Sequence, residues 1–254
     1  MSPFLRVAPE RAPITAVYGG GGLFGIAYGL GVAHGLQDLG VPLETCGAIG
    51  TSAGSWVASC VATGLGFEAL EAQPDVRVPN LRPGWLRGVA GEVLGDARSH
   101  LVRASALRLP TLRRELLHDR PLADLVAASS SVPGVFAPAV VQGRLYVDGG
   151  VRSLASADLA PAADHLLLVA PLAGAVLGAA GRGLEALLQQ ETRRWEERTG
   201  GRAHLIRPNA AIARMVSSPT HLFDKARALD VYPMAYVQAS SLMASRPGLV
   251  RLAA

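Results

Sequence analysis

One pentapeptide constrains the fold more than any other stretch of this sequence. Its residues, Gly50-Thr51-Ser52-Ala53-Gly54, follow a short apolar run, Cys46–Ile49, and precede an alanine-rich stretch of helical character, Trp56–Thr63. This order predicts a strand, a sharp turn and a helix, with Ser52 exposed at the tip of the turn. The glycines at both ends of the pentapeptide lack the Cβ atoms that would clash where the helix packs back on the strand.

Such a turn is suited to presenting a nucleophile. The helix that follows points its free N–H groups, including that of Ala53, toward the place where a substrate oxyanion would form. The pattern G-x-S-x-G is short, however. In a chain rich in glycine and alanine, an ordinary strand-to-helix turn without a nucleophile can have the same pattern. The other motifs of the chain must decide between these two interpretations.

A glycine-rich loop lies upstream, between a β-rich run at Ile14–Tyr18 and a stretch of helical spacing that ends at Gly40. Consecutive glycines let backbone N–H groups turn toward one point, which suits an anion or a developing oxyanion. The loop Gly20-Gly21-Gly22-Leu23-Phe24-Gly25 also fits G-x-G-x-x-G, the dinucleotide-binding fingerprint, with Glu44 at about the expected distance downstream.

We favour the oxyanion hole over the dinucleotide site. The ribose-binding acid should end the second strand, whereas Glu44 precedes that strand and the serine turn ends it. If the two strands are parallel neighbours, their loops emerge side by side at one sheet edge. We therefore expect backbone N–H groups near Ser52 from a set of five residues, Gly20, Gly21, Gly22, Gly25 and Ala53.

A candidate general base follows a predicted hairpin, Val140–Val147, which ends in Asp148-Gly149-Gly150. An aspartate at the end of an apolar strand, followed by two glycines, is held at a sheet edge where ligands gather, although Asp-Gly is also a common turn. A Ser-His-Asp triad is disfavoured, because only one strand precedes the serine turn and no histidine lies in a glycine-flanked or turn-tip context.

The remaining periodicity predicts an α/β sandwich with a mainly parallel sheet. Expected strands are His165–Ala170 and His204–Ile206, and expected helices are Leu122–Ser129, Leu184–Arg198 and Phe223–Ala244. Prolines punctuate the segment from Glu68 to Asp119, which we expect to form a cap and adjoining helices around the site.

The composition indicates one domain with a sizeable core, since half of the 254 residues are hydrophobic. Met1–Pro13 has no apolar core typical of a signal peptide, and no stretch has the character of a membrane-spanning helix. We therefore expect a cytoplasmic protein, soluble or peripherally associated with a membrane. The two cysteines, Cys46 and Cys60, do not make a disulfide framework.

The formal charge of +4 is unevenly distributed. The segment Arg77–Arg120 holds nine arginines against four acidic residues, so it carries +5 by itself. Such a surplus could contact anionic lipid headgroups, and a solvated arginine-rich surface is an equal alternative. Nucleic acid is disfavoured as a partner, because aromatic residues are not interleaved with the basic ones.

Four segments, in this order and spacing, resemble the patatin-like phospholipase family. They are residues 20–25, 50–54, 128–138 and 148–150. The resemblance covers residues 14–161, and residues 162–254 are expected to complete the same single domain. It implies a three-layer α/β/α sandwich and a lipid acyl hydrolase with Ser52 as nucleophile and Asp148 as base. It implies no metal, no cofactor and a lipid or acyl-ester substrate, and no protein partner can be inferred.

The sequence departs from this family at Phe24, where an arginine or lysine is often found. Three alternatives to a phospholipase stay open. A carboxylesterase or acyltransferase acting on other esters would use the same two residues, and a catalytically silent lipid-binding protein would keep the fold. A nucleotide-binding oxidoreductase is the most distant alternative.

Overall fold

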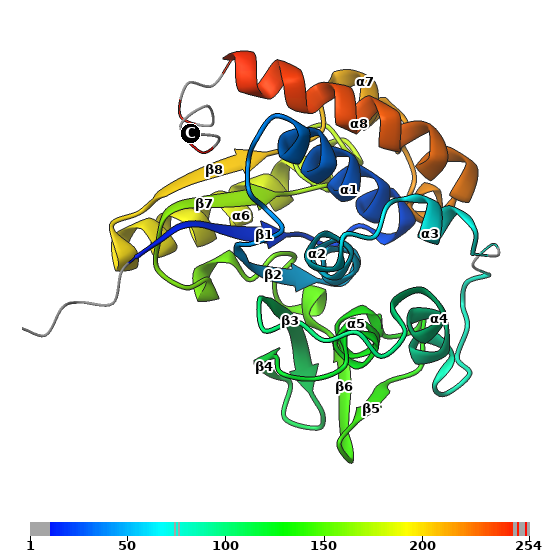
Figure 1. The fold of residues 1–254 in the computed structure, drawn as a ribbon. Coiled ribbons are helices and arrows are strands. Elements are labelled where there is room, and N and C mark those ends of the chain that lie inside the picture. The colour runs from blue at the N-terminus through cyan, green and yellow to red at the C-terminus, as the bar shows by residue number, and fades with distance from the viewer. Residues whose placement is uncertain (1–10, 74, 76, 246–247, 249–251, 253–254) are drawn as a thin grey trace, which may run out of the picture.

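The computed structural model describes residues 11–73, 75, 77–245, 248 and 252, so the segment considered for a signal peptide lies mostly outside it. Within these residues the centre is an eight-stranded sheet in the order β5-β6-β3-β2-β1-β7-β8, with β4 also paired to β3 (Figure 1). The strands are β1 (Ala12–Tyr18), β2 (Gly47–Thr51), β3 (Val102–Arg108), β4 (Arg113–Leu117), β5 (Ala139–Val141), β6 (Arg144–Asp148), β7 (Ala163–Val169) and β8 (Arg202–Ile206).

Five of these strands are parallel to one another, in the order β3-β2-β1-β7-β8, and β6 runs antiparallel to β3 at one side. The helices are α1 (Gly22–Asp38), α2 (Ala53–Thr63), α3 (Glu68–Glu71), α4 (Trp85–Leu94), α5 (Leu122–Ser130), α6 (Ala179–Thr199), α7 (Ala210–Arg214) and α8 (Lys225–Ser245). Short 3-10 turns are η1 (Gly149–Val151), η2 (Ala157–Leu159) and η3 (Pro219–Phe223).

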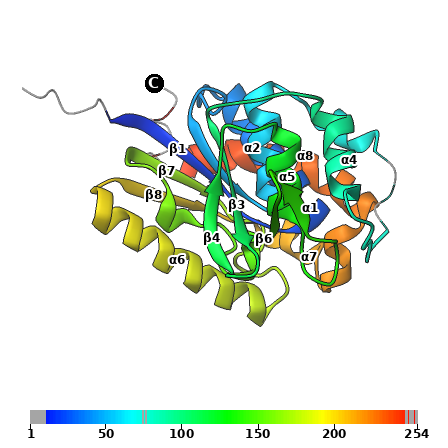
Figure 2. The ribbon, with the colours of Figure 1, turned by 90° about the horizontal axis from the view of Figure 1, so that it is seen from below.

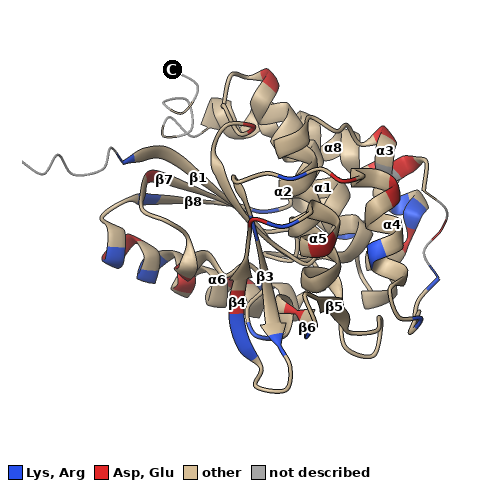
Figure 3. Ribbon diagram, turned by 60° about the horizontal axis from the view of Figure 1, so that its bottom comes forward, with Lys and Arg blue, Asp and Glu red and all other residues tan. Residues whose placement is uncertain are grey.

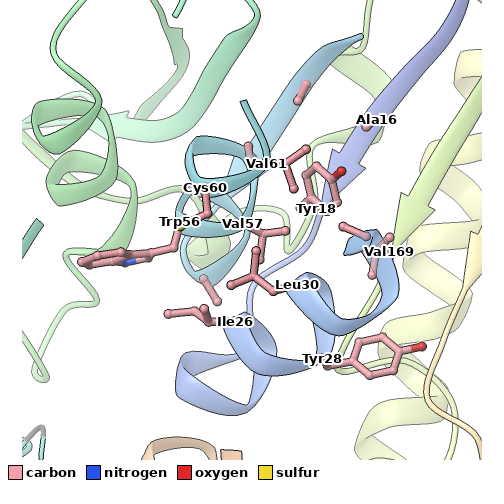
Figure 4. Close-up of a cluster of buried hydrophobic side chains, with 14 of the residues drawn as sticks. Ala16, Tyr18, Ile26, Tyr28, Leu30, Trp56, Val57, Cys60, Val61 and Val169 are labelled. Atoms are coloured by element: carbon pink, nitrogen blue, oxygen red, sulfur yellow. The ribbon is translucent and has the colours of Figure 1, made fainter. Parts of the chain in front are cut away.

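The sheet is buried on both faces, which confirms the predicted three-layer α/β/α sandwich with a mainly parallel sheet. Helices α1, α2, α5 and α8 lie on one face and α6 on the other (Figure 2). Successive residues of a strand point to opposite faces of the sheet, so they belong to two different hydrophobic cores. Tyr18 belongs to the cluster that includes Leu30 and Val57 (Figure 4). The adjacent Val17 belongs to the cluster on the other face, which includes Leu188 and Trp195.

Helix α8 packs closely against α1 because α1 has glycines at the contact. A Cβ atom on Gly31 would lie 2.5 Å from the carbonyl oxygen of Tyr232, and one on Gly35 would lie 2.6 Å from that of Tyr236. Farther along, a Cβ on Gly22 would lie 2.6 Å from the carbonyl oxygen of Leu222 in η3. The chain that leads into α8 therefore rests on the glycine-rich loop.

The expectation for Glu68–Asp119 was wrong in part. Helices α3 and α4 lie in this segment as expected, but so do strands β3 and β4, and β3 is an interior strand that pairs with β2 and β6 on one edge and with β4 on the other. The run Val102–Arg108 contains three small residues and two arginines, so its strand character is weak in the sequence. Its central residues are nevertheless fully buried by neighbours from both sides.

The arginines of the basic segment do not form one continuous surface. Figure 3 shows basic residues on α4 and, apart from these, on the β3–β4 hairpin. With partners in the described part of the chain, three of the nine arginines take part in ion pairs, namely Arg87 with Asp124, Arg108 with Glu115 and Arg114 with Asp158. A contact of this segment with anionic lipid stays a prediction.

Candidate active site

Ser52 lies at the predicted turn between β2 and α2, half-buried, with φ 53° and ψ −122°. This backbone conformation is strained for a residue with a side chain, and such strain is typical of functional sites. Glycine is required on both sides of Ser52 because other backbone atoms come too close to leave room for a Cβ. A Cβ on Gly50 would lie 2.4 Å from the carbonyl oxygen of Gly54, and one on Gly54 would lie 1.9 Å from that of Tyr18.

A buried serine holds the turn in place. The backbone N–H of Ser52 donates to the Ser129 hydroxyl oxygen at 2.9 Å, and that hydroxyl donates to the carbonyl oxygen of Ser105 at 2.7 Å. These contacts connect the turn to α5 and to β3. The sequence does not indicate this role for Ser129, because a serine at the end of an alanine-rich helix carries no signal for a partner 77 residues away.

Strand register brings Asp148 close to Ser52. Thr51, the last residue of β2, pairs with Ser105 of β3, and the next β3 residue, Ala106, pairs with Asp148 at the end of β6. Because β3 extends past the end of β2 and β6 returns antiparallel along it, β6 ends beside the turn. Because β4 pairs with the other edge of β3, β2 and β6 share one edge of β3, and the two candidate residues meet there where the two strands end.

The Asp148 carboxyl is almost fully buried, with 3% of the residue exposed. Burial raises its pKa to about 6, although hydrogen bonds from the Ser52 hydroxyl and from the Gly150 N–H favour the charged form and lower it. The Gly150 N–H donates to Asp148 Oδ1 at 2.6 Å. A carboxyl group with a pKa near 6 can accept and return a proton close to neutral pH.

The glycine-rich loop lies against the serine turn. A Cβ on Gly20 would lie 3.4 Å from the Cβ of Ser52, and one on Gly25 would lie 3.1 Å from the Cβ of Ala53. Gly21 and Gly22 adopt φ values of 159° and 60°. Residues with a side chain rarely adopt these φ values, so the path of the loop beside the serine requires glycine at these two positions.

The five candidate oxyanion donors are not equivalent. The N–H of Gly20 donates to the carbonyl oxygen of Leu154 at 2.9 Å, and that of Gly25 donates to Gly21 at 2.8 Å, so both are already engaged. Within the described residues, the N–H groups of Gly21, Gly22 and Ala53 donate no hydrogen bond. The last two belong to the first turns of α1 and α2, where N–H groups have no partner within the helix.

The segment that follows Asp148 supports the glycine-rich loop from the opposite face of the sheet. Gly149 approaches β3 so closely that a Cβ on it would lie 2.5 Å from the Ser105 carbonyl oxygen. Farther on, Glu191 of α6 accepts hydrogen bonds from the Ser153 hydroxyl at 2.5 Å and from the Ala157 N–H at 3.0 Å. These two bonds flank Leu154, whose carbonyl oxygen holds the glycine-rich loop.

Ser52 and Asp148 open into a cavity of about 390 Å³. Its wall is mainly apolar, with large side chains such as Leu23, Ile26, Trp56, Trp85, Phe136 and Phe223. Ile26 and Trp56 also belong to the core cluster drawn in Figure 4. An apolar cavity with a few polar groups at one point is typical of a site for a largely apolar ligand.

Aromatic contacts close one side of the cavity. Trp85 of α4 stacks on Phe136 with ring centroids 5.7 Å apart, and Phe136 meets Phe223 edge-on at 6.2 Å. The sequence does not predict this wall, because it combines segments that are more than 130 residues apart in the chain.

Phe24, the departure from the expected first motif, does not line the cavity. It is fully buried and stacks on Tyr28 with ring centroids 6.3 Å apart. Histidine is likewise missing from the described cavity wall. No group of three or more His, Cys, Asp or Glu residues in the described parts of the chain is arranged to hold a metal ion. The helices described in the structure also include none that could span a membrane.

Comparison with known proteins supports the resemblance seen in the sequence. The family model described as patatin-like phospholipase matches residues 85–160. This range begins at α4 and includes Ser129 and Asp148, whereas Ser52 and the glycine-rich loop lie outside it. Among solved structures, the crystal structure of VipD from Legionella pneumophila is similar, at 14% identity and a TM-score of 0.47. The match covers 94% of this chain and 67% of that chain.

Proposed function

This chain resembles the patatin-like phospholipases, which implies a serine lipid acyl hydrolase, and on that premise we propose that Ser52 is its nucleophile and Asp148 its general base. One observation carries the proposal. A strained, glycine-flanked serine and a buried carboxyl with a pKa near 6 interact at the wall of an apolar cavity. The cavity would receive the acyl chain of an ester substrate.

In the first step, the Ser52 hydroxyl attacks the ester carbonyl carbon while its proton moves to Asp148. A carboxylate is a weak base for a serine hydroxyl, so the proton transfers as the new C–O bond forms. The carbonyl oxygen becomes an oxyanion, which the free N–H groups of Gly21, Gly22 and Ala53 would stabilise. Gly20 and Gly25 shape the loop instead, because their N–H groups are engaged.

The tetrahedral intermediate then expels the alcohol, which takes the proton from Asp148, and leaves an acyl ester on Ser52. In the second half of the reaction, Asp148 accepts a proton from a water molecule that attacks this ester. The same N–H groups hold the second oxyanion. The acid leaves when Ser52 regains its proton from Asp148, so both residues return to their starting states.

We infer that residues 14–161 and 162–254 form one catalytic domain. Strand β7 continues the sheet by pairing with β1, and α8 packs along α1. The second part also supplies Phe223 to the cavity wall. The cytoplasmic location expected from the sequence stays a prediction.

The test is labelling of the purified protein with a fluorophosphonate probe, followed by mass spectrometry of the modified peptide. We expect labelling at Ser52, loss of labelling in Ser52→Ala, and a sharp decrease in Asp148→Asn. Ser241→Ala, which changes an exposed serine on α8, is the matched control and should label like the unmodified protein. A folded protein without any labelling would favour the silent lipid-binding alternative.

A second assay separates the remaining alternative. Hydrolysis of soluble short-chain esters is compared with hydrolysis of phospholipid vesicles by the same preparations. A carboxylesterase or acyltransferase acting on other esters would process the first and leave the second intact. The apolar cavity supports activity on long acyl chains, so we expect cleavage of both.

A further inference from the structure

The cavity beside Ser52 contains the only lysine of this protein. The sequence contains this one lysine, Lys225, and 23 arginines. Lys225 is the first residue of α8. Its half-buried side chain lines the same cavity as Ser52 and Asp148. All other strongly basic residues are absent from the described cavity wall, so Lys225 is its one ammonium or guanidinium group.

The Lys225 ammonium has unused hydrogen-bonding capacity. Its Nζ donates to the carbonyl oxygen of Gln73 at 2.6 Å, and an ammonium carries three protons. No carboxylate among the described residues lies within 4.0 Å of it, although the exposed Glu71 lines the same part of the wall. Its place at the beginning of a long helix adds positive potential, because the helix macrodipole is positive there.

The fold also limits how far this ammonium lies from the reacting groups. Leu222 contacts Gly22 of the glycine-rich loop, as described above. Lys225 follows three residues later, and three residues span at most about 11 Å even when fully extended. The close packing of α8 on Gly31 and Gly35 holds this segment in place.

We propose that Lys225 binds a phosphate group of the substrate while the acyl chain of the same molecule occupies the apolar part of the cavity. Lysine acts as a point charge toward phosphate, and an apolar environment strengthens the attraction. This inference rests on the proposed hydrolase function and assigns to it a residue, Lys225, that selects acyl esters with a phosphate near the ester.

The experiment compares two substrates with the same acyl chain, a 1-acyl lysophosphatidylglycerol and the corresponding neutral 1-acylglycerol. The unmodified protein, Lys225→Met and Lys225→Arg are measured on both. We expect Lys225→Met to lower kcat/KM about tenfold or more on the phosphate-bearing substrate, mainly through KM, and to change it less than twofold on the neutral one. Lys225→Arg should restore most of the loss, since it keeps the charge.

Equal losses on both substrates would overturn the proposal, because they would indicate that Lys225 only holds the Gln73 segment in place. No loss on either substrate would overturn it as well. Inorganic phosphate added to the 1-acylglycerol assay tests the source of the phosphate. We expect no inhibition, and inhibition that disappears in Lys225→Met would indicate a site for free phosphate instead of a headgroup.

Failure of the hydrolase proposal gives a different result. In that case the unmodified protein cleaves neither substrate and its Ser52 is not labelled by the fluorophosphonate. Cleavage of the neutral substrate together with labelling of Ser52, but without a selective effect of Lys225→Met, would overturn only the assignment of Lys225.

Discussion

Ser52 and Asp148 meet along one edge of β3, because β2 ends opposite Ser105 and β6 ends opposite the next residue, Ala106. Ser52 follows the parallel strand β2, Asp148 ends the antiparallel strand β6, and β4 pairs with the opposite edge of β3. The carboxyl is thereby buried by the sheet while it reaches the serine hydroxyl. Several properties of the protein should depend on this arrangement.

Activity should rise with pH through about 6. The raised pKa of Asp148 means that its carboxyl is mostly protonated below pH 6 and cannot accept the Ser52 proton. The measurement is kcat/KM on a soluble ester from pH 4.5 to 8.5. We expect about a tenfold loss for each pH unit below 5.5 and a plateau above 7. A flat profile across pH 5–7 would exclude Asp148 as the base.

Asp148→Asn should be more favourable for the stability of the fold at high pH than at low pH, when the variant is compared with the unmodified protein at each pH. The folded pKa of about 6 exceeds the unfolded value of about 3.8, so the native state loses stability as the pH rises between these values and the charge becomes buried. Asp148→Asn removes this loss. The melting temperature of the variant, relative to the unmodified protein, should be higher by several degrees at pH 8 than at pH 4. A difference that is the same at both pH values would contradict the burial of this charge.

Gly54→Ala should strongly destabilise the protein, because the new methyl group would lie 1.9 Å from the Tyr18 carbonyl oxygen and force β1 and α2 apart. We expect a loss of about 3 kcal/mol, at the upper end of the usual range for overpacking, measured by urea unfolding.

The control is Gly88→Ala, in the interior of α4, where a Cβ would have no heavy atom within 4 Å. There alanine should be neutral or should stabilise the helix by up to about 1 kcal/mol. Similar stabilities for the two variants would mean that β1 and α2 are not packed as closely as described.

Ser129→Ala should lower activity through the position of the serine turn. The Ser52 N–H would lose its acceptor and the Ser105 carbonyl its donor, which costs about 1–3 kcal/mol for buried groups. We expect kcat to fall at least tenfold with KM nearly unchanged, because the apolar cavity is preserved. Ser131→Ala is the control, since the Ser131 hydroxyl, at the end of α5, donates to the Ala127 carbonyl oxygen of that helix and to no other group in the described part of the chain. Equal effects of both changes would argue against a specific role for Ser129.

The parts of the fold that could be predicted from the sequence are those where glycine is needed for close approach. Gly22, Gly50 and Gly54 mark contacts that a Cβ would prevent, so the glycines in the sequence indicate where the backbone packs closely. The apolar strands β1, β2 and β7 and the hairpin β5–β6 were also predicted correctly to within two residues at each end.

The parts that could not be predicted depend on contacts between distant segments. Strand β3 carries arginines at both ends and small residues between them, and its burial comes from neighbours that the local sequence does not indicate. The engagement of the Gly20 N–H by Leu154 depends on a partner 134 residues away. No sequence motif includes Lys225, and only the packing of α8 on α1 brings this residue to the cavity.

The hairpin that carries Asp148 has a consequence for how this protein can change over time. Its tip, Gln142-Gly143, has positive φ at both residues, as in a two-residue hairpin turn, and projects beyond the end of β2. Insertions at this tip would lengthen the hairpin outward and leave Asp148 opposite Ala106. A shift of β6 by one residue against β3 would instead turn the carboxyl to the other face of the sheet. Variation in length can therefore accumulate at one end of this strand, while its other end tolerates none.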